Sequence, residues 1–113
     1  LIYAHIKGPY EFGHDGDAVG KMKNIEEIDR LFFDSILQES KSGNVYIVAY
    51  ADHSTPCIKR SHSADPVPLL VSGRNIQNDS SFRFTEEFAA KGILGRVFGS
   101  KVISIARREI LKR

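Results

Sequence analysis

The sequence is short of cysteine and of long apolar runs, and both shortages exclude classes of protein. Its single cysteine, Cys57, forms no intrachain disulfide, which excludes a disulfide-stapled secreted fold and predicts a reducing, cytoplasmic compartment. A membrane helix needs about 20 consecutive apolar residues. The opening LIYAHIKG is short and is interrupted by His5 and Lys7, so we predict no membrane association.

The sequence also lacks an excess of charge of one sign. Sixteen basic residues against 14 acidic ones leave a net charge of +2, whereas charge-driven nucleic-acid binders carry a large basic excess, so we predict no nucleic-acid partner. The 113 residues, 42% of them hydrophobic, suit one compact domain. Because the chain starts without Met inside an apolar run, we expect residues 1–113 to be a piece of a longer protein.

Three apolar segments predict strands. LIYAHI (1–6) ends at Gly8 and Pro9, NVYIVAYA (44–51) is continuous enough to be buried on both faces, and VPLLVSG (67–73) is the third. The loop at 54–66 contains two prolines and shows no helical periodicity. It is also short for a parallel crossover, so the third strand should run antiparallel to the second.

Helical patterns separate and follow these strands. Asp17 should cap a helix that Gly43 stops, whereas residues 7–16, rich in Gly and ionisable side chains, read as an irregular loop. Thr85 should cap a short helix and Ser100 should open the last one. The inward faces of the first and last helices are predicted to be Ala18, Met22, Ile25, Ile28, Phe32 and Ile36, and Val102, Ile103, Ala106 and Ile110. This order of elements predicts an α/β fold.

Ionisable side chains concentrate in GHDGD (13–17) and in ADHSTPCIKRSHSADPVP (51–68). In an α/β sheet, ligands gather beyond the strand ends, where His14, Asp52 and His53 would lie. If the chain doubles back after residue 54, His62 returns to the same edge. Nitrogen and oxygen donors of this kind suit Mn²⁺, Zn²⁺ or Co²⁺ better than Ca²⁺, and Asp52 and His53 would serve one ion or bridge two.

Other interpretations of these residues stay open from spacing alone. Asp-Gly beside His14 is also a common turn, and Asp-His at a strand end occurs by chance. His5, inside an apolar segment, is typical of a structural histidine. Cys57 fits a small packing residue better than a nucleophile, since nothing in its surroundings in the sequence activates a thiol.

Three segments in the same order, HIKGPYEFGHDGD, ADHSTPCIKRSHSADPVP and AAKGILGRVFG, resemble the C-terminal part of archaeal-type cofactor-independent phosphoglycerate mutases, of the alkaline phosphatase superfamily. The resemblance implies a partial three-layer sandwich: a mixed, mostly parallel sheet with helices on both faces. It implies a cytoplasmic glycolytic enzyme interconverting 3-phosphoglycerate and 2-phosphoglycerate through a phosphoserine, with two divalent ions, Mn²⁺ or Mg²⁺. Residues 1–113 would be the C-terminal part of its metal-binding catalytic domain.

Carried over residue by residue, the resemblance makes Asp52 and His53 ligands of one ion, and His14 and His62 ligands of the other. The family usually has an aspartate where this chain has Tyr10, so Glu11 is the candidate substitute ligand. The nucleophilic serine is expected upstream of this chain, which supplies no catalytic nucleophile and should be inactive alone. An exposed strand edge would also favour a homo-oligomer.

Two alternatives to the mutase remain. The metal motifs alone do not exclude another phosphatase or phosphomutase of the superfamily, because segments outside the chain choose the substrate. Tyr10 in place of a carboxylate motivates the second alternative, a non-catalytic module that has lost its chemistry.

Overall fold

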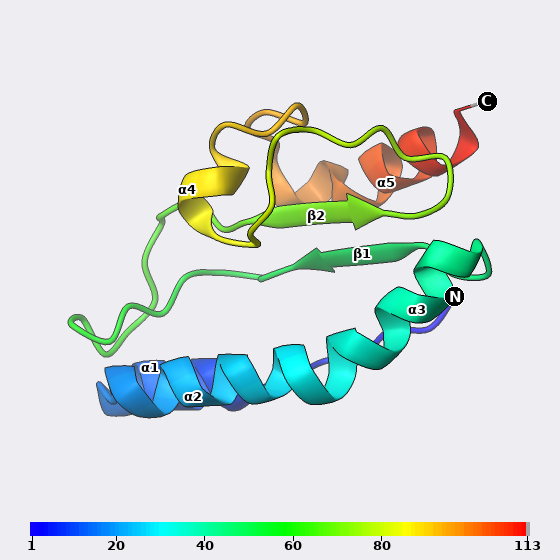
Figure 1. The fold of residues 1–113 in the computed structure, drawn as a ribbon. Coiled ribbons are helices and arrows are strands. Elements are labelled where there is room, and N and C mark those ends of the chain that lie inside the picture. The colour runs from blue at the N-terminus through cyan, green and yellow to red at the C-terminus, as the bar shows by residue number, and fades with distance from the viewer. Residues whose placement is uncertain (113) are drawn as a thin grey trace. The chain divides into compact units, whose positions relative to one another are not determined.

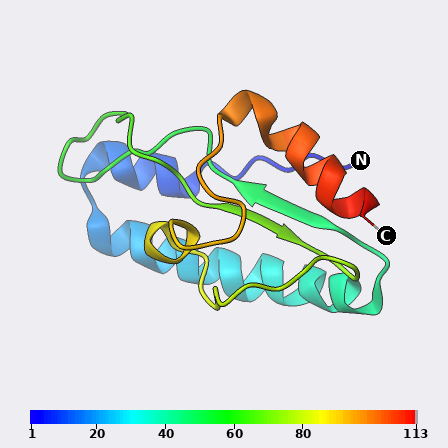
Figure 2. The same cartoon turned by 90° about the horizontal axis from the view of Figure 1, so that it is seen from above.

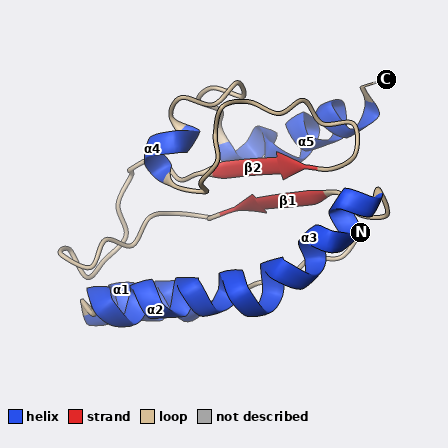
Figure 3. Ribbon diagram, in the orientation of Figure 1, coloured by secondary structure: helices blue, strands red, loops and turns tan. Residues whose placement is uncertain are grey.

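The computed structural model describes residues 1–112, and these fall into two compact units. Unit 1 comprises Leu1–Ser35 and His53–Asp65, and unit 2 comprises Ile36–Asp52 and the chain from Pro66 onward. Helices and strands both occur, as Figure 3 shows, which confirms the α/β class. The one sheet of the described residues is a two-stranded antiparallel pair, so the parallel strands that we expected are not present among them.

Unit 1 is built on two helices, α1 (Gly8–Asp15) and α2 (Ala18–Ile28), which run side by side (Figures 1 and 2). The prediction of an irregular loop at 7–16 is therefore wrong. Pro9 lies in the first turn of α1, where a missing N–H costs no hydrogen bond. Gly16 ends the helix in the left-handed conformation, with φ of 72°, which glycine adopts without steric cost.

The strand predicted at residues 1–6 does not form. Residues 1–6 are not part of the one sheet of the described chain, and a lone strand has no partner for its N–H and C=O groups. Ile2 and Tyr3 are accordingly 94% and 76% exposed. The apolar composition of residues 1–6 predicted a strand, but a strand also needs a neighbouring strand to accept and donate its backbone hydrogen bonds.

A long helical run follows, from α2 through a π-helical turn (Asp29–Phe33) into α3 (Asp34–Ser42). Asp17 caps it as predicted, since its Oδ1 accepts a hydrogen bond from the Gly20 N–H at 2.8 Å. Gly43 follows its last residue with φ of 85°. The predicted inward face is not buried: no residue of α2 is, and Met22 and Ile25 are about half exposed, because no element of unit 1 covers them.

Unit 2 contains the sheet. Strand β1 (Ile47–Tyr50) pairs with β2 (Leu69–Ser72) in antiparallel register, Ile47 opposite Ser72 and Tyr50 opposite Leu69 (Figure 1). The predicted antiparallel direction is therefore confirmed. The expected burial of β1 on both faces holds only in part, because Ile47 is buried while Tyr50 is exposed.

After β2, the rest of unit 2 consists of loops and of helices that lie between and after them. Thr85 caps α4 (Glu86–Ala89) as predicted, and a 3₁₀ turn (Gly99–Lys101) leads into α5 (Val102–Leu111), which runs alongside the strands in Figures 1 and 2. Ile103, predicted to face inward, is 66% exposed, because only one side of α5 is buried. The buried apolar side chains are Ile47, Val71, Val102 and Ala106. Among the described residues, no helix has the length and apolarity needed to cross a bilayer.

Asp79 fastens two loops of unit 2, and this predicts a pH-dependent stability. Its carboxylate accepts hydrogen bonds from the N–H groups of Ser81 (2.8 Å) and Ile93 (3.1 Å), which lower its pKa below the ordinary value. A lowered pKa stabilises the fold above the unfolded pKa of about 3.9, and the stabilisation is lost as pH falls through the folded pKa. Asp79→Ala should therefore lower Tm at pH 7, with a difference from wild type that shrinks toward pH 3.

Thermal unfolding followed by circular dichroism at several pH values measures this difference. Glu27→Ala is the control, because it removes a carboxylate from the exposed side of α2 and should leave Tm nearly unchanged. A Tm difference for Asp79→Ala of the same size at every pH would show that the ionised carboxylate is not what fastens the loops.

Candidate metal centre

The loop of unit 1 doubles back on itself and brings two histidines together. Ser54 and Ser63 form an antiparallel bridge, in which the Ser63 N–H donates to the Ser54 carbonyl at 3.0 Å. His53 and His62 flank this bridge, and their rings stack with centroids 3.7 Å apart at 26°. The return of the chain predicted from its prolines and missing helical period is therefore confirmed.

Helix α1 brings the third imidazole to the same place. The Nε2 atoms of His14 and His62 lie 3.3 Å apart. Nδ1 of His14 lies 3.1 Å from the carbonyl oxygen of Arg60 and, since a carbonyl only accepts, this contact is a hydrogen bond in the tautomer that carries the proton on Nδ1. Arg60 itself has the left-handed backbone, with φ of 51°, in the turn that presents this carbonyl to His14. The Arg60 carbonyl therefore favours the tautomer in which Nε2 of His14 has a lone pair facing His62.

The loop is seated on the helices through the backbone of Thr55, which is 4% exposed. Lys21 of α2 donates from Nζ to the Thr55 carbonyl at 2.9 Å. Gly13 of α1 lies so close that a Cβ there would come within 2.4 Å of the same carbonyl oxygen. The Thr55 hydroxyl lies 3.3 Å from Nδ1 of His53. The absence of a side chain at Gly13 thus lets the histidine-bearing loop reach α1.

The spacing of His14 and His62 fits a shared metal ion. Two imidazole nitrogens at the usual Zn–N distance of about 2.0–2.1 Å and a tetrahedral angle stand roughly 3.3–3.4 Å apart. The two Nε2 atoms are 3.3 Å apart. The donor set therefore fits a divalent ion held by these two histidines. The Arg60 carbonyl, which contacts Nδ1 of His14, would keep the His14 ring oriented toward the ion.

The other predicted ligands are Asp52, His53 and Glu11. No group of three or more His, Cys, Asp or Glu side chains among residues 1–112 is already arranged around one point. Glu11 is exposed on α1, and Asp52, also exposed, is the last residue of its unit-2 segment, directly before His53. Their roles as ligands stay predictions.

Cys57 and Tyr10 lie near the cluster, and the sequence predicted no ligand role for either of them. Cys57 is half-buried and its thiol lies 3.9 Å from the Phe12 carbonyl, which suits the packing interpretation. Tyr10, noted in the sequence only as a missing carboxylate, has its ring beside all three imidazoles. Its i, i+4 spacing from His14 on one helix was the signal that could have placed it there.

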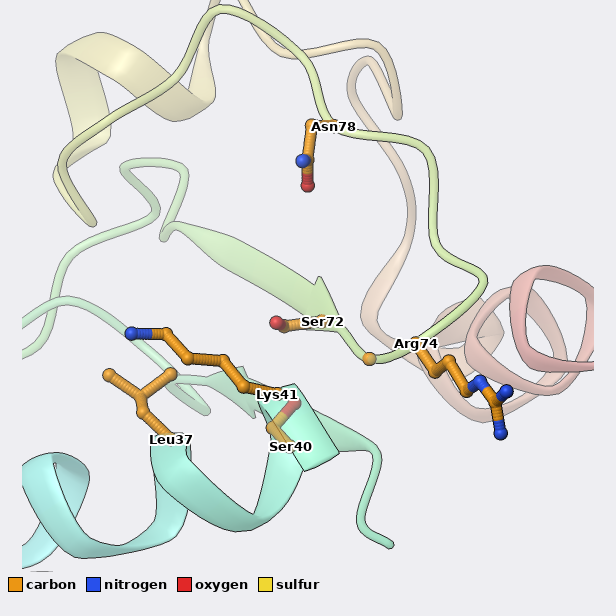
Figure 4. Close-up of a pocket in the computed structure, with 7 residues that line it drawn as sticks. Leu37, Ser40, Lys41, Ser72, Arg74 and Asn78 are labelled. Atoms are coloured by element: carbon orange, nitrogen blue, oxygen red, sulfur yellow. The ribbon is translucent and has the colours of Figure 1, made fainter. Parts of the chain in front are cut away.

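Unit 2 has a separate recess of about 370 Å³. It lies between the end of α3 and the residues that follow β2, and Figure 4 shows Lys41, Ser72 and Asn78 extending toward it while the Arg74 guanidinium points away. None of its lining residues is acidic: they are Leu37, Ser40, Lys41, Ser72, Gly73, Arg74 and Asn78. Without a carboxylate or imidazole, this recess does not suit a metal cation.

Comparison with known proteins agrees with a metal-binding interpretation. Residues 1–106 match the family model described as the Metalloenzyme superfamily. A 2,3-bisphosphoglycerate-independent phosphoglycerate mutase from Aeropyrum pernix is 42% identical over 101 residues, which cover 88% of this chain and 24% of that protein. A similarly named mutase from Methanothermobacter thermautotrophicus is 41% identical over 105 residues, 93% of this chain and 24% of the relative.

A solved structure of a Pyrococcus horikoshii protein has the same fold, with a TM-score of 0.85 and 39% identity over 94% of this chain and 32% of that one. The resemblance to archaeal phosphoglycerate mutases is thereby confirmed. The chain spans about a quarter of the length of the curated relatives that it matches.

Proposed function

Because the chain belongs to the Metalloenzyme superfamily, we propose that it forms the C-terminal, metal-binding part of a cofactor-independent phosphoglycerate mutase. The reaction interconverts 3-phosphoglycerate and 2-phosphoglycerate in glycolysis and gluconeogenesis, in the cytoplasm, with two divalent ions, for which Mn²⁺, Mg²⁺, Zn²⁺ and Co²⁺ are the candidates. The observation that carries the proposal is the 3.3 Å separation of the His14 and His62 Nε2 atoms, which come from segments 48 residues apart.

In this proposal the chain supplies ligands and their support. His14 and His62 hold one ion, and Asp52 and His53 contribute to a second. A divalent ion at such a site supplies charge that stabilises the oxygens of a transferring phosphoryl group. The Arg60 carbonyl keeps the proton of His14 on Nδ1, and Lys21 holds the loop through Thr55, so that the nitrogens stay oriented without reorganisation.

The phosphoryl carrier lies outside these residues. The resemblance assigns that role to a serine upstream, which would take the phosphoryl group from one hydroxyl of glycerate and return it to the other. The chain alone should therefore be inactive, whereas the complete polypeptide in which it occurs should be an enzyme.

The test is an assay of that complete polypeptide with 3-phosphoglycerate, with and without Mn²⁺, followed by ³¹P NMR. The proposal expects 2-phosphoglycerate to form only with metal, and His62→Ala to lower kcat/KM by at least about 100-fold. Release of free phosphate without 2-phosphoglycerate would favour a phosphatase of the same superfamily. Full activity of His62→Ala would contradict the role of the cluster.

A further inference from the structure

Tyr10 lies against every imidazole of the cluster. Its ring centroid is 4.5 Å from that of His14 in an edge-to-face arrangement of 75°, 5.7 Å from that of His62 and 5.9 Å from that of His53. These are the separations at which aromatic rings pack favourably. The ring of Tyr10 therefore packs against all three imidazoles of the cluster.

Position 10 lies four residues before His14 on α1, so its side chain determines which donor atoms stand beside the imidazoles. Residues four apart on a helix lie on the same face, so position 10 and His14 present their side chains to the same region. A carboxylate at position 10 would add a charged oxygen donor to the imidazoles. A phenol hydroxyl is a poorer donor for a hard cation than a carboxylate.

We propose that Tyr10 sets the metal preference of this cluster, by packing its ring against the imidazoles and leaving a donor set rich in nitrogen. Such a set favours Zn²⁺ and Co²⁺, whereas carboxylate oxygens favour Mn²⁺ and Mg²⁺. The inference rests on the proposed metal-binding function and adds the class of ion that this chain selects. It also assigns the effect to the ring of Tyr10 and not to its hydroxyl group.

Isothermal titration of Zn²⁺ and of Mn²⁺ into the complete polypeptide in which the chain occurs tests the proposal. Tyr10→Phe keeps the ring and should leave the ratio of Zn²⁺ to Mn²⁺ affinity within about twofold of wild type. Tyr10→Asp should raise the Mn²⁺ affinity by at least about tenfold and narrow that ratio by a similar factor. Tyr3→Asp, which adds the same charge in the exposed residues 1–6, should change neither affinity.

Three results would overturn the inference. A tenfold loss of Zn²⁺ affinity in Tyr10→Phe would make the hydroxyl a ligand. An unchanged ratio in Tyr10→Asp, in a variant whose circular dichroism and Tm match wild type, would show that position 10 does not reach the ion. If His62→Ala bound Zn²⁺ with wild-type affinity, the ion would not be held by this cluster. That result would contradict both the proposed function and this inference.

Discussion

Replacing His62 with alanine is expected to weaken Zn²⁺ and Mn²⁺ binding to the chain by at least about 100-fold. The change removes one of the two nitrogens that lie 3.3 Å apart, and a single remaining imidazole is a weak ligand. Loss of a group that merely supports a ligand already costs about 10–100-fold in metal affinity, so loss of the ligand itself should cost at least as much. Isothermal titration of both ions into wild type and variant measures the effect.

His5→Ala is the matched control, because it removes an imidazole from the exposed residues 1–6 and should leave affinity within about twofold of wild type. His53→Ala should also weaken binding, since its ring stacks on that of His62 at 3.7 Å. Identical weak binding in wild type and all three variants would contradict the metal site. That outcome would favour the non-catalytic module.

Adding one methyl group at Gly13 is expected to damage the same site without touching a ligand. Gly→Ala inside a helix ordinarily stabilises by about 1 kcal/mol. Here the new Cβ would lie 2.4 Å from the Thr55 carbonyl oxygen and 2.9 Å from its Cγ2, so the loop must move off α1. Because that loop carries His53 and His62, Gly13→Ala should lower stability by about 1–3 kcal/mol and metal affinity by about tenfold or more.

Urea unfolding and isothermal titration measure the two effects. Gly99→Ala is the control: a Cβ there meets nothing within 4 Å, so neither the free energy of unfolding nor the affinity should fall. A Gly13→Ala variant with wild-type metal affinity would mean that the seating of Thr55 on α1 does not position the histidines.

Local signals in the sequence predicted what depends on neighbouring residues. The Asp17 cap, the stop at Gly43 and the Thr85 cap all formed as expected, because each depends on one side chain and a few backbone groups. The segment at 7–16 was misjudged as a loop, since Pro9 and Gly16 read as breakers until their places at the two ends of a helix are known.

Burial was less predictable than the caps and ends of the helices. Residues 1–6 and the apolar face of α2 have the composition of buried elements, yet both are exposed in unit 1. An apolar pattern says which side of an element avoids water, but it does not supply the element that covers that side. Exposed apolar surface of this kind favours self-association. Self-association of this chain stays a prediction.

The grouping of the histidines was predictable because it follows from chain direction. Two prolines and a short connection indicated a return, and the return places His62 beside His53. The contribution of Gly13 was not predictable, since it depends on how closely the loop approaches α1. The place of Tyr10 follows from its i, i+4 spacing to His14, but only once residues 8–15 are known to be a helix. Side-chain type identifies candidate ligands, but distances between distant segments decide which of them meet.

Anomalous diffraction at the zinc edge, from crystals of the chain grown with Zn²⁺, most directly tests whether the returning loop and α1 build one cation site. The account predicts a peak about 2.0–2.1 Å from Nε2 of both His14 and His62. Zinc bound only elsewhere, with these two nitrogens beyond about 4 Å from any peak, would contradict it.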